Sequence, residues 1–490
     1  MSPNPDPIKH VILLLLENRS FDQMLGCFRE RYPNLEGIDP ANIRSNTDKT
    51  GQIFKQEETQ DVQMDLDPGH RFEDVMVQLE NNNSGFVKNF VERHSDSSPE
   101  QRQQVMSFYK LMFLDASHRM ARDFTICDHW FSSVPGPTWP NRFFAFSGTS
   151  AGTVRMPKGI TDPDLEGFFA QHQDTIFDRL NEAQRSWKVY FYDFPSSLIL
   201  NHQRRQENLA RYFRIDQFFK EVANEAEFPE FCLIEPKFAG RDQNDDHPPH
   251  NVMKGEKLIA DVYNAIRSRE ELWKSSLLVI LFDEHGGFYD HVSPPAAVAP
   301  DDEREYKRNP TRAEIPKFDF DRLGVRVPAI LVSPWVDKRV ETTEFDHTSL
   351  LKYLIDKWNL GPLGARTTAA NSIGAAITRD TPREDTLPFI RVSQAHLTSP
   401  RPELEFEDVT EHHAALDAFG EHLLGELDDA AAARIEKVAH AAQTFTRVKN
   451  TIGKKLIAAG ARLTSDYQSQ TRSRAAMITN VILARFGRPL

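Results

Sequence analysis

Two pairs of polar residues follow directly on short apolar runs in this chain, Glu17 with Asn18 and Asp283 with Glu284. Short apolar runs of this kind predict buried strands of a parallel sheet. In open α/β sheets, ligands bind beyond the carboxyl ends of the strands, so we expect both pairs at one edge of the sheet. Carboxylate and amide oxygens are hard ligands. The two pairs therefore predict a site for a divalent metal ion.

A hydroxyl that could act as a nucleophile lies between these pairs in the sequence. Pro137 disfavours helix for the residue before it and Pro140 suits a first helical turn, which predicts Thr138 at or just before a helix N-terminus. Free N–H groups make that position attractive to a phosphate, and Asn141 and Arg142 could donate further hydrogen bonds to it. The simpler alternative is that Thr138 only caps the helix. A metal that lowers the pKa of its hydroxyl would make Thr138 a nucleophile.

Histidines are the natural proton donors and phosphate ligands for chemistry at phosphorus. A single histidine is more often a structural hydrogen-bonding residue, so position decides the ranking. The preferred catalytic candidates are His70, His250 and His291. The second group, expected to contact the phosphate, comprises His247, His285 and His347.

Five short apolar runs predict the strands that position these side chains. They are residues 8–16, 187–192, 231–234, 277–282 and 327–332. Segments such as 254–269 have apolar residues at helical spacing between these runs. Strands that alternate with helices predict an α/β fold with a mostly parallel central sheet sandwiched by helices. Two long polar stretches, 39–67 and 294–316, are expected to leave the sheet as functional loops.

Composition sets the broad class of the protein. With 490 residues, of which 39% are hydrophobic and 27% charged, the chain can bury a large core. It contains no apolar stretch long enough to span a bilayer and no visible secretory leader. Three widely spaced cysteines, Cys27, Cys127 and Cys232, predict buried thiols. We expect a cytoplasmic protein from the residues as printed; attachment to a membrane surface and leaderless export stay open.

The chain is predicted to divide into a catalytic body, residues 1–402, and an all-helical extension, residues 403–490. Residues 441–490 carry nine basic residues against one acidic residue, a net +8, so the overall charge of −13 leaves −21 for the rest. An acidic body argues against a nucleic-acid binder. Two stretches of the extension, 445–463 and 477–486, combine apolar residues at helical spacing with basic neighbours. They either pack on the protein or lie at a membrane interface.

Four motifs carry a resemblance to a known family. In chain order they are residues 17–22 (ENRSFD), 128–142 (DHWFSSVPGPTWPNR), 283–292 (DEHGGFYDHV) and 345–349 (FDHTS). With them the chain resembles, over roughly residues 8–360, the bacterial phosphatidylcholine phospholipase C and acid phosphatase family. That family belongs to the alkaline phosphatase superfamily. The resemblance implies an alkaline-phosphatase-like α/β sandwich and one divalent metal ion: Ca, Mg, Mn or Zn.

The same resemblance implies roles for individual residues. The metal ligands would be Glu17, Asn18, Thr138, Asp283 and Glu284. Thr138 would attack phosphorus, so that a phospholipid yields diacylglycerol and a headgroup phosphate through a phospho-threonine. Two alternatives stay open: an acid phosphatase that acts on monoesters, and a toxin-like protein that acts on membranes through its C-terminal helices. The sequence does not predict the oligomeric state.

Substrate selection would depend on other residues. Asp193, at the end of a predicted strand, could supply a countercharge for a cationic headgroup. Aromatic residues could form a cage for a quaternary ammonium, although core packing is their commoner use. The candidates are Trp130, Trp139, Tyr192, Tyr289 and Trp335. The basic extension favours an enzyme of lipid surfaces, so phospholipase C is the preferred hypothesis.

Overall fold

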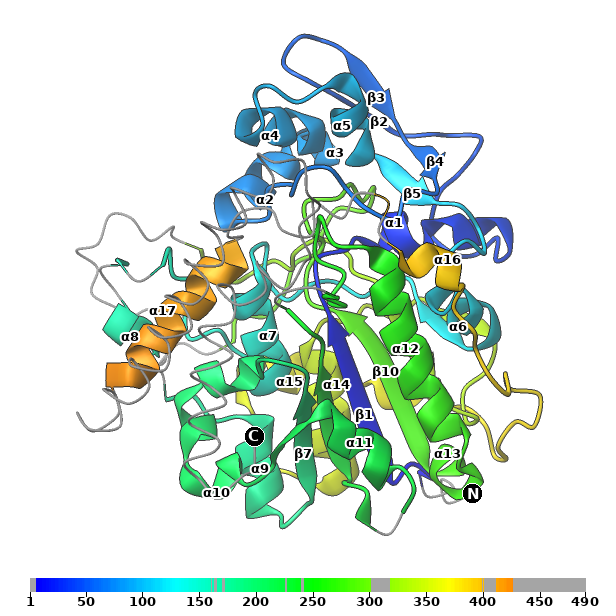
Figure 1. The fold of residues 1–490 in the computed structure, drawn as a ribbon, viewed down its shortest axis with the longest axis vertical. Coiled ribbons are helices and arrows are strands. Elements are labelled where there is room, and N and C mark those ends of the chain that lie inside the picture. Colours follow the sequence, from blue (N-terminus) through cyan, green and yellow to red (C-terminus); the bar gives the residue numbers. More distant parts are fainter. Residues whose placement is uncertain are drawn as a thin grey trace, which may run out of the picture.

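The computed structural model describes residues 6–159, 161–162, 165–169, 172–224, 227–238, 242–300, 318–398, 400 and 411–425. An eight-stranded sheet lies at the centre of the molecule, in the order β12-β6-β11-β10-β1-β9-β7-β8 (Figure 1). Its strands are β1 (His10–Leu16), β6 (Thr125–Cys127), β7 (Trp187–Phe191), β8 (Tyr212–Arg214), β9 (Phe231–Glu235), β10 (Ser276–Phe282), β11 (Ala329–Val332) and β12 (Arg339–Glu341). The mostly parallel α/β fold predicted from the sequence is confirmed.

The two strands that lead into the polar pairs, Glu17 with Asn18 and Asp283 with Glu284, are neighbours at the centre of this sheet. β1 pairs in parallel with β10 on one side and with β9 on the other. Every residue of β1 and β10 is buried, which explains their unbroken apolar runs. β11 runs antiparallel to both of its neighbours, a direction that its apolar run alone does not reveal. All five predicted strands are present, whereas β6, β8 and β12 have three residues each and are too short to show a pattern.

Helices cover both faces of the sheet. The helices of the body are α1 (Phe21–Leu25), α2 (Phe72–Gln78), α3 (Glu80–Asn83), α4 (Phe86–Arg93), α5 (Pro99–Gln104), α6 (Ser117–Asp123), α7 (Thr138–Ser147), α8 (Leu165–Phe169), α9 (Ile176–Glu182), α10 (Gln206–Leu209), α11 (Ile215–Glu221), α12 (Val252–Arg267), α13 (Glu270–Lys274), α14 (Thr348–Trp358), α15 (Gly364–Ala369) and α16 (Gln394–Leu397). In Figure 1, α12 lies in front of the sheet and α14 behind it. The apolar periodicity of 254–269 thus corresponds to α12.

The first polar excursion forms a cap over the end of the sheet where β1 finishes. The excursion contributes the short strands β2 (Ser45–Thr47), β3 (Ile53–Lys55) and β4 (Glu57–Thr59). A later strand, β5 (Ser107–Tyr109), pairs with β4. Together with α2 to α5 they lie at the top of Figure 1. The cap has its own apolar core, in which Phe86 contacts Tyr289 with ring centroids 5.3 Å apart. The second excursion, 294–316, falls largely outside the described residues.

The first helix of the C-terminal extension, α17 (Glu411–Gly425), packs on the body. Its Phe419 ring lies 5.1 Å from the Phe169 ring and 5.6 Å from the Phe194 ring. Residues 426–490, with both amphipathic stretches, lie outside the described residues, so a membrane role for them stays a prediction. Among the described helices, none combines the length and apolar character needed to cross a bilayer.

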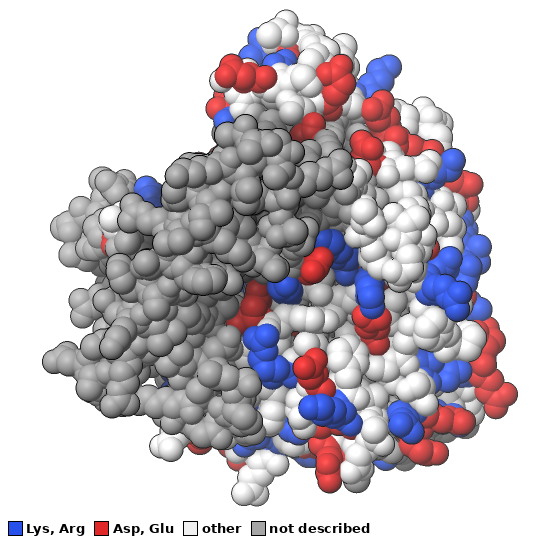
Figure 2. All heavy atoms as spheres, viewed as in Figure 1, with Lys and Arg blue, Asp and Glu red and all other residues white. Residues whose placement is uncertain are grey.

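Basic and acidic side chains are interspersed over the described surface on the face seen in Figure 2. The three cysteines are buried free thiols, as predicted.

Candidate metal and nucleophile site

The five ligands implied by the resemblance converge at the carboxyl ends of β1 and β10. Leu16 is in register with Phe282, so the two polar pairs that follow these residues leave the sheet side by side. The backbone N–H of Asn18 donates to Asp283 Oδ1 at 3.2 Å. The Thr138 hydroxyl donates to Asn18 Oδ1 at 3.4 Å. All five residues are fully buried.

Thr138 is the first residue of α7 rather than its cap. The N-cap is Pro137, and no side chain caps this helix in the described structure. The Thr138 hydroxyl points instead toward Asn18, so the capping alternative is wrong. Asn141 organises the loop before the helix: its amide donates to the carbonyl of Gly136 at 2.9 Å and accepts from the N–H of Val134 at 3.0 Å.

The sequence suggested that Arg142 could donate a hydrogen bond to a phosphate. In the structure its guanidinium pairs with carboxylates. Its Nε donates to Asp283 Oδ2 at 2.8 Å, its Nη1 pairs with Glu235, and its Nη2 lies 3.4 Å from Glu17 Oε1. It stands four residues after Thr138 and therefore on the same helical face, which is the sequence signal for its position. Arg142 joins the ends of three neighbouring strands at the site.

The charge of this buried cluster is unbalanced. Burial raises the pKa of Glu17 to about 7 and that of Asp283 well above its ordinary value, although Arg142 opposes both shifts. Neither carboxylate oxygen of Glu17 accepts a hydrogen bond from the described residues. Buried charges without partners are costly, and a cation coordinated by these oxygens would remove that cost. The residues present therefore fit a divalent metal ion.

Two histidines hold Glu284 in its charged form. Burial alone would raise its pKa, but His70 and His285 outweigh burial and lower the pKa to about 2. His70 Nδ1 lies 2.8 Å from Glu284 Oε1 and His285 Nδ1 lies 3.4 Å from Glu284 Oε2. His285 also contacts the Gln78 side chain through Nε2 at 2.8 Å. The described polar contacts of the His285 side chain are thus to a predicted metal ligand and to Gln78.

Three of the predicted histidines line one side of the site. The rings of His70 and His247 lie 5.5 Å apart, and those of His247 and His250 lie 5.9 Å apart. His250 Nδ1 is 2.7 Å from Asp245 Oδ1. The backbone carbonyl of Asp245 accepts a hydrogen bond from the N–H of Glu17 at 2.8 Å, which ties this row of histidines to the ligand cluster.

The remaining predicted residues have other surroundings. His347 Nε2 donates to the backbone carbonyl of Asp283 at 2.6 Å and so helps to position this predicted metal ligand. Asp193 accepts from the backbone N–H groups of its neighbour Phe194 and of Phe238, which lies in the segment after β9. The described hydrogen bonds and ion pairs of His291 go to Asp22 and Glu36, in a separate cluster. The structure therefore does not bring His291 to the metal site.

One residue at the site was not expected there. His412 of α17 is buried, and its Nδ1 lies 3.3 Å from Glu17 Oε2. Its ring packs edge-on against Phe238 and Trp139, with centroids 5.1 and 6.2 Å away. The predicted boundary at residue 402 separated His412 from the catalytic body. Its sequence surroundings contain no signal of the contact, because the two partners are nearly the whole chain apart.

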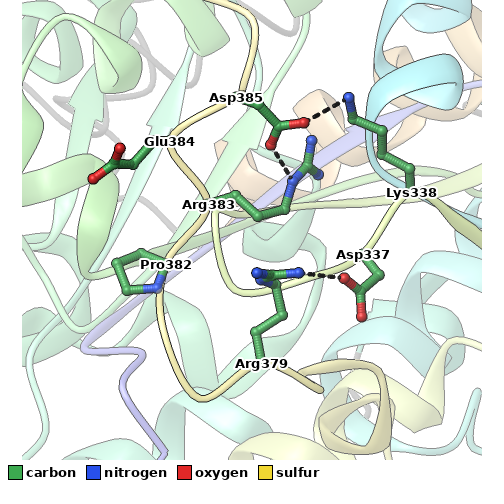
Figure 3. A pocket seen from close by; sticks show the side chains of 7 residues that line it. All are labelled: Asp337, Lys338, Arg379, Pro382, Arg383, Glu384 and Asp385. Carbon is green, nitrogen blue, oxygen red and sulfur yellow. Dashed lines mark hydrogen bonds and ion pairs between the residues drawn. The ribbon is translucent and has the colours of Figure 1, made fainter.

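A large surface pocket lies apart from this site. Its volume is about 730 Å³, and its walls come from the loop before β12 and from residues 379–385 (Figure 3). Arg379 pairs with Asp337 at 2.7 Å, and Lys338 pairs with Asp385 at 2.9 Å. Since its charges pair with one another, this pocket is a surface groove braced by ion pairs.

Comparison with known proteins connects the geometry with a family. Residues 8–361 match the Phosphoesterase family. Non-specific phospholipase C6 of Arabidopsis thaliana is 34% identical over 450 residues, which cover 86% of this chain and 83% of the relative. Phospholipase C B of Mycobacterium tuberculosis is 27% identical over 400 residues, with 71% and 72% covered. Non-hemolytic phospholipase C of Pseudomonas aeruginosa is 27% identical over 419 residues, with 75% and 58% covered.

Solved structures with a similar arrangement are more distant. A phosphonate monoester hydrolase of Agrobacterium radiobacter has a TM-score of 0.34 and 8% identity, with 77% of this chain and 79% of the other covered. A protein in the alkaline phosphatase superfamily from Vibrio parahaemolyticus has a TM-score of 0.32 and 9% identity, with 78% and 72% covered. The match over residues 8–361 and the 34% identity to the plant enzyme show that this chain belongs to the Phosphoesterase family.

Proposed function

We propose that this phosphoester hydrolase is a metal-dependent phospholipase C that cleaves the glycerol-side phosphodiester of phosphatidylcholine-like lipids. The observation that carries the proposal is the convergence of Thr138 with the two polar pairs at one buried sheet edge. The names of the relatives, which include phospholipases C of plants and bacteria, support the substrate class.

A divalent cation would be held by Glu17, Asn18, Thr138, Asp283 and Glu284. An all-oxygen donor set suits magnesium, calcium or manganese better than it suits zinc. When bound, the ion would neutralise charge on the phosphoryl oxygens and lower the pKa of the Thr138 hydroxyl.

The chain's own groups would carry the two displacements. Thr138 enters the reaction as the alkoxide, its proton having passed to solvent. In the first displacement its Oγ1 forms a bond to phosphorus while the bond from phosphorus to the glycerol oxygen breaks. The backbone N–H groups at the start of α7 would bind the phosphoryl oxygens. His250, oriented through Nδ1 by Asp245, gives a proton to the departing diacylglycerol oxygen.

In the second displacement, water attacks phosphorus, and the bond from phosphorus to Thr138 Oγ1 breaks. Thr138 leaves as the alkoxide. His250 is neutral after the first step and takes the proton from this water, so the two steps restore its starting state. The headgroup phosphate leaves with the oxygen of that water. Arg142 keeps Glu17 and Asp283 in place throughout.

A substitution pair tests the nucleophile. Thr138→Ala should reduce turnover of a choline phosphodiester to background while the thermal unfolding temperature stays unchanged, because only a hydroxyl and a methyl group are removed. Thr138→Ser keeps the hydroxyl and should retain measurable activity. Acid-quenched wild-type protein should show a mass increase of one phosphocholine group at Thr138. Near-normal turnover by the alanine variant would exclude the proposed nucleophile.

Substrate comparison separates the proposal from the phosphatase alternative. Under identical metal conditions we expect faster release of product from a choline phosphodiester than from a phosphomonoester. Faster monoester hydrolysis would favour an acid phosphatase. Vesicle leakage caused by Thr138→Ala would favour a toxin-like protein that acts through its helices.

Binding of a membrane surface by the basic C-terminal extension is part of the same proposal. Truncation after Gly425 keeps α17, which packs on the body, and removes the segment with a net charge of +8 over residues 441–490. The truncated chain should lose much more activity on anionic vesicles than on a soluble phosphodiester. Equal losses on both substrates would reject a role at the membrane.

A further inference from the structure

The N-terminal end of α17 reaches into the site. His412, the second residue of this helix, has its Nδ1 3.3 Å from Glu17 Oε2. Its ring packs edge-on against the ring of Trp139, which directly follows the proposed nucleophile in the chain. A helix of the C-terminal extension therefore touches both a predicted metal ligand and the first turn of α7.

His412 also lies close to the groups on the other side of the site. Burial lowers the pKa of His412 to about 3, and nearby positive charges lower it further; they belong to Arg142, His70 and His250. The phosphoryl group of a substrate has to lie within reach of Glu17 and of His250 in the proposed reaction. The His412 ring therefore takes up room beside the groups that a bound phosphodiester must contact.

The nucleophile cannot be reached from bulk solvent in this structure, because Thr138 and Glu17 are both 0% exposed. A lipid has to bring its phosphorus next to Thr138 Oγ1, so part of the surrounding protein must move. β1, β10 and α7 are buried at every residue, and close packing resists their movement. By contrast, α17 lies against α8 at the edge of the molecule (Figure 1).

Contacts near both ends hold α17 on the body. At its N-terminal end is the contact between His412 and Glu17. In its C-terminal half, the Phe419 ring lies 5.1 Å from the Phe169 ring and 5.6 Å from the Phe194 ring. None of these three phenylalanines belongs to the central sheet. The helix can therefore move away without disrupting a strand.

We propose that α17 is a strap that closes the site and must move away from Glu17 before a lipid phosphodiester can reach Thr138. This role rests on the proposed function, since a lipid needs a wider opening than a small soluble ester. The basic segment, with a net charge of +8 over residues 441–490, follows α17 in the chain. An anionic surface that binds this segment more tightly when the strap is open would shift the strap toward opening.

A disulfide across the strap tests the proposal. A Cβ atom added at Gly159 would lie 4.0 Å from Ala414 Cβ, and disulfides have Cβ atoms about 3.5–4.5 Å apart. The oxidised Gly159→Cys/Ala414→Cys protein should hydrolyse phosphatidylcholine in vesicles at least tenfold more slowly than the same protein after reduction. Mass spectrometry verifies the disulfide. Equal rates in the two forms would overturn the proposal.

The reduced double variant is the matched control for this comparison. Gly159 has φ +119°, so a side chain there strains the backbone. That strain is present in the oxidised and the reduced protein alike, and only the covalent link differs between them. Reduction should therefore restore the rate on vesicles.

A substitution away from the site tests the strap from its other end. Phe419→Ala removes the ring that packs on Phe169 and Phe194, which should weaken the closed state and raise the rate on vesicles at least twofold. Phe219→Ala, which removes a ring of α11 that is 37% exposed, should leave the rate unchanged. A lower rate in Phe419→Ala with the unfolding temperature unchanged would show that α17 completes the active site, and would overturn the proposal.

Hydrogen exchange detects the movement without any turnover and without a disulfide. The amides of α17 should exchange faster when anionic vesicles are added to the wild-type chain, whereas those of α12 should not change. Unchanged exchange in α17 would overturn the proposal. A chain whose strap responds to vesicles but which hydrolyses no choline phosphodiester would refute the proposed function and leave the strap standing.

Discussion

Two buried clusters of acidic residues lie just after β1, and they differ in how the charges of their carboxylates are balanced. Around Asp22, the Arg326 guanidinium donates to Asp22 Oδ1 at 3.0 Å and to Asp290 Oδ1 at 2.9 Å, and His291 adds a further contact at 2.8 Å. Around Glu17, one arginine serves several carboxylates, and both Glu17 oxygens lack a hydrogen bond from the described residues. The first cluster is complete within the protein, whereas the second requires a cation.

The pKa shifts of Asp22 and Glu17 differ in the same way. Burial raises the pKa of Asp22, but His291 and Arg326 outweigh burial and hold it below its ordinary value. Burial raises the pKa of Glu17 to about 7 because Arg142 is shared with other acids. A group of buried acids is therefore weak support for a metal site by itself. The distinguishing feature is that neither carboxylate oxygen of Glu17 has a hydrogen-bond partner among the described residues.

The largest expected effect is on activity, at the incomplete cluster. Glu17→Gln should lower kcat/KM about 10³-fold, roughly 4 kcal/mol of transition-state stabilisation, because it removes a metal ligand. Its unfolding free energy without metal should equal or exceed that of the wild type, since a desolvated charge is gone. Steady-state kinetics and denaturant unfolding measure both quantities. A strongly destabilised Glu17→Gln without metal would erase the contrast between the clusters.

The complete cluster should respond in the opposite way. Asp22→Ala removes one of the two carboxylates that pair with Arg326 and the nearer of the two that pair with His291. The loss of one member of a buried pair costs about 3–5 kcal/mol of unfolding free energy. Activity per folded molecule should stay near the wild-type value, because Asp22 contacts none of the proposed ligands in the described structure. Arg326→Met with Asp22→Ala should recover part of the stability. Activity loss with normal stability would place Asp22 in the catalytic machinery.

Metal removal should have an intermediate effect. A ligand present at about 100 times its Kd stabilises the folded state by about 2.7 kcal/mol, so chelation should lower the unfolding temperature of the wild type. The unfolding temperature of Glu17→Gln should hardly change on chelation. Thermal scans with and without chelator measure this difference, and an equal decrease in both proteins would show that the stabilising ion binds elsewhere.

The smallest expected effect is on the pH dependence of stability. Asp22 raises the pKa of His291 above its ordinary 6.5 against the effect of burial, and the pKa of Asp22 itself lies below 3.8. The contribution of His291 is complete below pH 6.5 and is lost as pH rises through its folded pKa; that of Asp22 is lost as pH falls through its own. The His291–Asp22 pair therefore stabilises the folded state most between pH 3.8 and pH 6.5, where both contributions are complete.

Unfolding temperatures of wild type and His291→Gln at pH 5.5 and pH 9 test this prediction. The difference between the two proteins should be larger at pH 5.5, when the imidazolium is paired with Asp22. A difference that grows toward pH 9 would show that the ring is neutral in the folded state.

Local sequence was enough to predict the five main strands, the start of α7 and the two polar pairs at the sheet edge. Strand runs and proline positions act over a few neighbouring residues, so contiguous sequence contains their signal. Strands of three residues, such as β6, and the reversed direction of β11 depend on pairing with distant segments, which no local pattern records.

At the site, the sequence by itself determined which residues bring oxygen and hydroxyl groups to the sheet edge. Only the tertiary structure decided their partners: Arg142 among three carboxylates, His291 with Asp22 rather than at the metal site, and His412 beside Glu17. The physical reason is that desolvation and charge pairing depend on distances between residues far apart in the chain. Chemistry at this edge was written into short motifs, but the balance of charge that makes it a metal site arises only when the chain is folded.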